Sequence, residues 1–301
     1  MRYEIRTIIK DFYHFLKQPQ EIFTESLSAK QKWEILLYIL LLDFILVIIA
    51  SGILAFVDSF LFKLESDQLE DVFSNKGVLS IILIAAIFVP LIEELIFRFA
   101  LKYERNLLFH FFDFLSNNKA KKLWLKHFRV FFYLSAILFA LIHLTNYSNN
   151  NIFFYILAPL IVLPQFIGGI TLGYLRLKLG FFWGVLQHGL YNLIIFSFGI
   201  LFFNTSQLTK ITNADYSLEI NILEFGLNKP IKLETYKSED RIDSIIGDNI
   251  MIKELAEILN STDNNLLEKS KRLNIRFINK TNSKNPEFII INELKKEFDL
   301  N

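Results

Sequence analysis

Apolar residues gather into long, almost uninterrupted stretches over the first two thirds of this chain, and the pattern changes near residue 204. A helix that crosses a bilayer needs roughly 20 mostly apolar residues. Five segments have that character: Trp33–Val57, Leu79–Leu101, Phe128–Leu144, Ile152–Leu175 and Phe181–Phe203. We therefore expect residues 33–203 to form a transmembrane helical bundle of about five spans.

The segment that precedes these stretches, residues 1–32, has a different pattern. Charged residues run through it, and Pro19 ends a set of apolar positions at helical spacing, namely Ile5, Ile8, Ile9, Phe12, Phe15 and Leu16. This spacing predicts an amphipathic helix and not a cleaved signal peptide. Such a helix lies either in the membrane interface beside the first span or against the protein's own loops.

Residues 204–301 alternate apolar and polar positions over short runs, which is typical of half-buried strands. The pattern predicts strands at Tyr216–Phe225, Ile231–Tyr236, Leu273–Asn279 and Phe288–Ile291, and helices at Ile252–Leu259 and Glu293–Phe298. The predicted fold class is therefore an all-α membrane helical bundle with a small C-terminal soluble α+β domain.

Composition agrees with a membrane location, since 52% of the residues are hydrophobic and the mean hydropathy is +0.36. The formal net charge of +1 provides no overall field that would attract nucleic acid, so we expect none as a partner. Cysteine is absent, which excludes disulfides, thiolate metal sites and a cysteine nucleophile. Richness in Asn, Lys, Ile and Phe indicates an AT-rich bacterial genome, and hence the bacterial cytoplasmic membrane.

The charges next to the spans alternate in sign, and this pattern predicts the topology. The loop after the first span is acidic, with Glu65, Asp67, Glu70 and Asp71. Basic residues lie before the first span, after the second and after the fourth: Lys30 and Lys32; Lys102, Arg105, Lys119, Lys121, Lys122 and Lys126; Arg176 and Lys178. By the positive-inside rule the N-terminus is cytoplasmic, and five spans would then place the C-terminus outside.

Ionisable groups inside spans are informative, because an unpaired one in lipid costs several kcal/mol. The second span contains Glu93, Glu94 and Arg98. Glu94 and Arg98 are four residues apart and can form an ion pair, whereas Glu93 is rotated by about 100° and has no partner in its own helix. The Glu94 carboxylate is therefore neutralised, and the Glu93 carboxylate is available for chemistry. Alternatively, the whole group lies at the membrane interface and is simply solvated.

Two further polar groups lie in other spans. His143 falls in the third span, and His188 and Asn192 fall in the fifth. Because His188 and Asn192 are four apart, their side chains point the same way, and Gly189 between them leaves room for a close approach. A single histidine here is more often a packing residue than a ligand. Taken together, the three spans supply a carboxylate, two imidazoles and an amide that can converge.

The order of these motifs, EExxxR then FxxxH then HxxxN, resembles the signature of the CPBP family of intramembrane proteases, which includes the CAAX prenyl endopeptidases. The resemblance covers roughly residues 78–203, where Gly168, Gly169, Gly173 and Tyr174 also resemble the family's glycine-bearing core helix. The N-terminal helices are fewer than in the eukaryotic CAAX enzymes, and the C-terminal domain is not part of the family pattern.

The resemblance implies hydrolysis of a peptide or protein substrate at the membrane. In this interpretation Glu93 and His143 activate a water molecule, and His188 with Asn192 stabilises the oxyanion. Glu94 and Arg98 would be structural support, and no cofactor would be needed. A zinc ion bound by Glu93, His143 and His188 is the alternative, although the sequence has no HExxH helix.

Other functions stay open at this point. The chain has no serine, cysteine or GxGD aspartyl protease motif in a span. A non-catalytic membrane protein that binds a partner, as in bacteriocin immunity, is the main alternative. Proton-coupled transport also uses intramembrane Glu and His residues, but this sequence lacks the repeated halves that transporters often carry. The substrate and the oligomeric state have no signature in the sequence.

Overall fold

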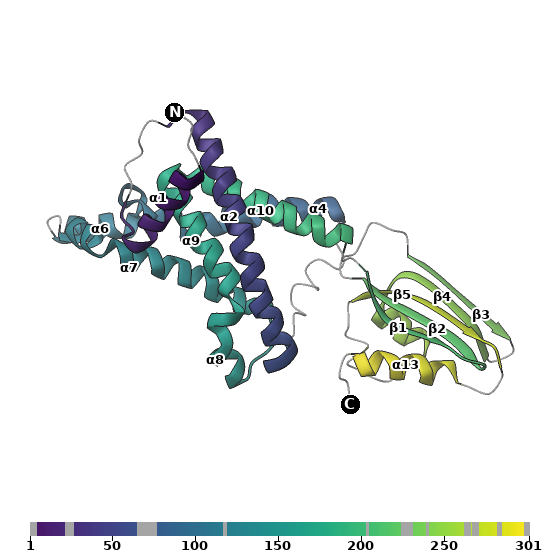
Figure 1. Ribbon diagram of the computed structural model, residues 1–301. Coiled ribbons are helices and arrows are strands. Elements are labelled where there is room, and N and C mark those ends of the chain that lie inside the picture. Colours follow the sequence, from purple (N-terminus) through teal and green to yellow (C-terminus); the bar gives the residue numbers. More distant parts are fainter. Residues whose placement is uncertain are drawn as a thin grey trace. The chain divides into compact units, whose positions relative to one another are not determined.

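The computed structural model describes residues 5–21, 27–64, 77–116, 119–202, 205–223, 231–238, 241–261, 266, 271–281 and 285–297. The acidic residues expected in the loop after the first span lie outside these ranges. The chain divides into two compact units, a helical one made of Met1–Ser66 with Leu83–Ile194, and one made of Asp67–Ile82 with Ile195–Asn301 (Figure 1).

Among the described residues, four helices are long and apolar enough to cross a membrane: Ala29–Leu61, Val78–Leu101, Lys119–Asn146 and Phe181–Phe202. Their elements are α2 (Ala29–Phe56) with the π-helix η1 (Val57–Leu61); α4 (Val78–Leu83), the π-helix η2 (Ile84–Phe88), α5 (Val89–Phe97) and the 3-10 helix η3 (Phe99–Leu101); α7 (Lys119–Ile142) with the 3-10 helix η5 (His143–Asn146); and α10 (Phe181–Phe202). The chain is thus an integral membrane protein, as expected.

The remaining expected span, Ile152–Leu175, is broken. It consists of α8 (Ile152–Ile161) and α9 (Leu163–Lys178), which meet at an angle of 41°. Pro164 occupies the first turn of α9, where its missing N–H and its ring prevent the two helices from continuing as one. If the bent pair counts as one span, the total is five, the number that the apolar pattern predicted.

The amphipathic segment forms α1 (Ile5–Lys17), and α1 packs on the helical unit itself. Ile8, Phe12 and Phe15 are buried in a cluster with residues of α2, α7 and α9. Ile5 and Ile9 on its other side are each 42% exposed. Between the spans lie the 3-10 helix η4 (Tyr103–Arg105) and α6 (Leu107–Ser116).

The second unit contains a five-stranded antiparallel sheet in the order β1-β2-β5-β4-β3. Its elements are β1 (Thr205–Thr212), β2 (Tyr216–Leu223), β3 (Lys232–Ser238), β4 (Arg241–Met251), α11 (Ile252–Ile258), β5 (Arg272–Asn279) and α13 (Pro286–Glu297). Three strands and α11 agree with the sequence pattern. Strands β1 and β4 were not expected, because neither shows a sustained alternation of apolar and polar residues.

One expected element of this unit has the wrong type. The apolar run Phe288–Ile291 suggested a strand, but it belongs to α13, and the described part of the separate helix expected at Glu293–Phe298 is part of the same element. The Asn285 side chain accepts hydrogen bonds from the backbone N–H groups of Glu287 and Phe288, which starts a helix. Burial of Ile290 and Leu294, four residues apart, in the sheet's core cluster then outweighs the strand propensity.

Candidate functional site

A gap in helical hydrogen bonding lies one turn before the acidic motif. The N–H of Val89 bonds to the carbonyl of Ile84, five residues back, so the next carbonyl in the series, that of Ala85, would need a donor at position 90. Position 90 is a proline, which has no N–H. The side chain of Asn192 fills this gap, with its Nδ2 atom 2.8 Å from the Ala85 oxygen. Asn192 therefore joins α10 to η2.

Gly189 allows this contact to form. A Cβ atom at Gly189 would lie 2.5 Å from the backbone oxygen of Ala86, closer than atoms pack in proteins. The absence of a side chain thus lets α10 approach η2 at backbone distance, as small residues do between membrane helices. His188 precedes this point in α10, so it is carried to the face of α5 that bears the two glutamates.

Glu94 and Arg98 form a buried ion pair in α5 and the residue that follows it. Arg98 Nη1 lies 3.4 Å from Glu94 Oε1, and both side chains are almost fully buried. The guanidinium also stacks on the ring of Phe139 in α7, at 3.6 Å from the ring centroid. This stacking replaces part of the solvation that the cation loses on burial.

His188 lies between the two carboxylates of the acidic motif. Its Nδ1 atom is 3.2 Å from Glu94 Oε1, and its Nε2 atom is 3.5 Å from Glu93 Oε2. Carboxylate oxygens accept hydrogen bonds, so a protonated ring could donate to both. The Glu93 side chain keeps 21% exposure, against 1% for Glu94. Of the two glutamates, Glu93 is therefore the one that a substrate can reach.

His143 begins η5, directly after the end of α7. Its Nδ1 atom lies 2.7 Å from the backbone oxygen of Phe139. A carbonyl can only accept, so Nδ1 carries the hydrogen and Nε2 of the neutral ring is an acceptor. The Phe139 ring contacts the rings of both His143 and His188, with centroid distances of 4.8 and 5.9 Å.

The residues singled out from the sequence thus fall into two groups. Glu93, Glu94, Arg98 and His188 are joined by direct contacts across α5 and α10. His143 adjoins them through Phe139, and Asn192 lies one turn further along α10 with one amide hydrogen donated to Ala85. The convergence of His188 and Asn192 on one ligand atom stays a prediction, because each contacts a different group here.

The zinc alternative requires three ligands at one point. In the part of the chain that the structure describes, no three His, Cys, Asp or Glu side chains are grouped closely enough to hold a metal ion. Glu93, His143 and His188 would have to move together before they could bind zinc in tetrahedral geometry. Metal-free and zinc-dependent chemistry both remain predictions.

Sequence reasoning missed two buried polar residues near this cluster. Asp43, at the centre of α2, is 3% exposed and is hydrogen-bonded by the side chain of Gln187, the neighbour of His188. A search for ionisable residues in every expected span would have found it. Arg176, expected in the loop after the fourth span, is instead buried in α9 and donates hydrogen bonds to the backbone oxygens of Arg98 and Phe99.

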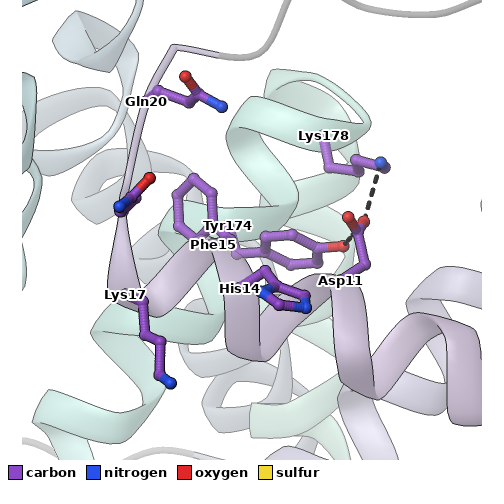
Figure 2. A pocket seen from close by; sticks show the side chains of 8 residues that line it. Asp11, His14, Phe15, Lys17, Gln20, Tyr174 and Lys178 are labelled. Carbon is purple, nitrogen blue, oxygen red and sulfur yellow. Dashed lines mark hydrogen bonds and ion pairs between the residues drawn. The ribbon is translucent and has the colours of Figure 1, made fainter.

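A pocket of about 400 Å³ lies elsewhere in the helical unit, between α1 and the last turn of α9. Figure 2 shows the Asp11 carboxylate between the Tyr174 hydroxyl and the Lys178 ammonium, at 2.8 and 2.9 Å. The rest of the lining is His14, Phe15, Lys17, Gln18 and Gln20. None of these residues belongs to the three motifs. The pocket is therefore separate from the candidate site.

Comparison with known proteins agrees with the motifs. Residues 75–194 match the family model described as "Type II CAAX prenyl endopeptidase Rce1-like", and this segment contains all three motifs. The resemblance to CAAX-type proteases drawn from the motifs is thereby confirmed. The comparisons with curated proteins and with solved structures found no match. The sheet-containing part of the second unit lies outside the matched segment.

Proposed function

We propose that this chain, whose residues 75–194 belong to the Rce1-like family, is a glutamate-type intramembrane endopeptidase. At the family level it is a CAAX-type membrane protease; the residue roles that follow are our proposal. These roles rest on one observation. Glu93 Oε2 lies 3.5 Å from His188 Nε2, inside a helical unit whose outer surface is apolar.

Glu93 is the general base of the proposed reaction. It takes a proton from a water molecule whose oxygen attacks the scissile carbonyl, and a new C–O bond forms. The Nε2 atom of His143 accepts a hydrogen bond from the same water, because its Nδ1 hydrogen is held by Phe139. When the C–N bond breaks, the proton that Glu93 took from water passes to the departing amine.

His188 and Asn192 stabilise the negative oxygen of the tetrahedral intermediate. Asn192 has a second amide hydrogen besides the one donated to Ala85. His188 donates from Nε2 when the substrate carbonyl enters between this ring and Glu93. Glu94 and Arg98 hold the His188 ring from its other nitrogen, which supports their role as scaffold. Fixed donors of this kind act mainly in the transition state.

The proposed substrate is a peptide or protein segment at the surface of the bilayer. We also propose that the membrane is the bacterial cytoplasmic membrane, with the N-terminus of the chain in the cytoplasm. The basic residues before the first span and after the second support this orientation. The C-terminal unit would act as a soluble α+β domain.

The decisive experiment is cleavage of candidate membrane peptides by purified wild type and Glu93→Gln. The glutamine keeps the shape of the side chain but cannot accept the proton, so turnover should fall by about 100-fold or more. Glu104→Gln is the matched control, since Glu104 is exposed and lies outside the spans. Equal loss in both variants, or none in either, would contradict the proposal.

Metal dependence is tested with the same peptides in strong chelator. Metal-free catalysis predicts unchanged turnover, and a stoichiometric zinc ion lost on chelation together with activity would reassign Glu93, His143 and His188 as ligands. A non-catalytic immunity protein makes a different prediction, because Glu93→Gln would then protect cells as well as wild type does at equal membrane abundance.

A further inference from the structure

Asp43 is a buried carboxyl that the proposed reaction does not use. It is at the centre of α2, and only 3% of it is exposed. It lies outside the segment that matches the family model, so the three motifs do not include it. No Lys, Arg or His among the described residues forms an ion pair with it. A carboxylate in this position would be a desolvated charge without a direct counter-ion.

The hydrogens around Asp43 can be assigned one by one. The side chains of Thr171 of α9 and Gln187 of α10 lie next to its carboxyl group. The hydroxyl of Thr171 donates its single hydrogen to the backbone oxygen of Gly168, 3.0 Å away. A backbone oxygen cannot donate in return. The Thr171 hydroxyl then has no hydrogen left for Asp43, so it does not supply the donor that Asp43 Oδ1 lacks.

Gln187 leads to the same result. Its Nε2 atom donates to Asp43 Oδ2 over 3.4 Å. The other oxygens of the two side chains, Asp43 Oδ1 and Gln187 Oε1, are buried and have no hydrogen-bond partner among the described residues. Both are acceptors, and leaving each of them unsatisfied would cost about 1–3 kcal/mol. The side chains around Asp43 therefore have fewer donor hydrogens than acceptor oxygens.

We propose that Asp43 is a protonated, neutral carboxylic acid that joins α2 to α10 and so positions His188. A proton on Oδ1 supplies the missing donor, removes the unpaired charge, and leaves Oδ2 to accept from Gln187. Because Gln187 precedes His188 in α10, a fixed Gln187 sets the rotation of the helix that presents His188 to Glu93 and Glu94. Only this positioning role rests on the proposed function; the protonation does not.

Two substitutions separate a neutral acid from a charged one. Asp43→Asn keeps the shape of the side chain and puts an amide N–H in place of the carboxyl O–H, so cleavage should stay within about threefold of wild type. Asp43→Leu removes both hydrogen-bonding groups, and the misplaced His188 should lower kcat by about 100-fold with little change in KM. Rescue by the amide and loss with the apolar residue is the expected pair of results.

Infrared spectroscopy of the full chain in lipid tests the proton directly. Wild type should show the carbonyl stretch of a protonated carboxyl, shifted in D₂O and absent from Asp43→Asn. Asp58→Asn is the control, since Asp58 is in the same span, is ion-paired with Lys63 and should leave the band unchanged.

The outcomes that overturn this proposal are distinct from those that overturn the enzyme. A missing band, or a loss of turnover in Asp43→Asn as large as in Glu93→Gln, means that Asp43 is charged or catalytic. Full turnover and unchanged thermal stability in Asp43→Leu mean that it positions nothing. If wild type cleaves no peptide, the infrared band and the thermal stability of the variants still decide whether Asp43 carries the proton and joins the helices.

Discussion

The two units of this protein differ in the side chains that they expose and in the charges that they bury. In the helical unit, large apolar side chains such as Leu41, Ile48 and Ile137 are exposed, while Glu94 and Arg98 have no exposed surface. In the second unit, the main buried cluster consists of apolar residues of the sheet and its helices. A water-soluble domain hides apolar surface, whereas a membrane domain exposes it to lipid and keeps its polar groups inside.

This difference shows which interaction holds each unit together. Burial of apolar surface provides little driving force between membrane helices, because lipid tails are as apolar as the side chains. Close packing at Gly189 and polar contacts such as Asn192 with Ala85 take its place. The second unit depends on its apolar core. The same type of substitution should therefore change the stability of the two units by different amounts.

Replacing an arginine by alanine should give the largest difference in stability loss between the two units. Arg98→Ala leaves the buried Glu94 carboxylate without its arginine, with His188 still beside it, and should destabilise the helical unit by about 3–5 kcal/mol. Arg276→Ala in β5 removes an exposed charge and should change the stability of the second unit, measured by amide hydrogen exchange in β2 and β5, by less than about 0.5 kcal/mol. All three tryptophans, Trp33, Trp124 and Trp183, lie in the helical unit, so their fluorescence during unfolding in detergent measures it alone. A small effect of Arg98→Ala would mean that water reaches Glu94.

Replacing an isoleucine by alanine should cost more stability in the second unit than in the helical unit. Ile275→Ala opens a cavity in the core of the sheet and should cost about 2–5 kcal/mol, measured as faster amide hydrogen exchange in β2 and β5. Ile137 is 42% exposed in α7, and Ile137→Ala should change the tryptophan unfolding curve by less than about 1 kcal/mol. Equal costs at the two positions would contradict the contrast between the units.

Adding a methyl group tests the close approach of α10 to η2. Gly189→Ala would put a Cβ atom 2.5 Å from the Ala86 oxygen, so the helices must separate at a cost of about 1–3 kcal/mol. Gly52 in α2 has no atom within 4 Å of the same position, and Gly52→Ala should be neutral or slightly stabilising. Thermal unfolding followed by tryptophan fluorescence compares the two, and similar curves would show that the helices are not in backbone contact.

The smallest expected effect is a pH dependence in the second unit. The Asn221 amide, and then Lys210, hold the pKa of Glu219 below its ordinary value of 4.5. A lowered pKa contributes stability that is complete above pH 4.5 and is lost as the pH falls through the folded-state value. The stability of β2, obtained from hydrogen exchange corrected for the intrinsic exchange rate, should therefore fall less steeply below pH 4.5 in Glu219→Gln than in wild type. Identical profiles would show that the carboxylate contributes nothing.

Much of the candidate site could be read from the sequence, because spacing of four residues within a helix is enough to predict a pair such as Glu94 with Arg98. Contacts between helices could not be read in this way. His188 meets both glutamates because Gly189 and Asn192 fix the distance and rotation of α10 against η2. The spacing within α10 alone suggested that His188 and Asn192 act on one atom.

The second unit was harder to predict, since its strands are defined by pairing and not by their own residues. β2 and β5 alternate clearly and were found, whereas β4 acquires its place by pairing with β3 and β5 on either side. In α13 the apolar run agrees with a strand, and the Asn285 cap together with burial of Ile290 makes it a helix.

By itself the sequence determined the membrane location, the number of apolar spans and the order of the three motifs, because those depend on length, composition and spacing along one helix. Only the tertiary structure decided which side chains share the interior. The freed carbonyl of Ala85, the ring of His188 between two carboxylates, and Asp43 beside Thr171 and Gln187 each involve separate helices. In lipid every buried polar group must find its partner within the protein, and the partners come from whichever helices pack together.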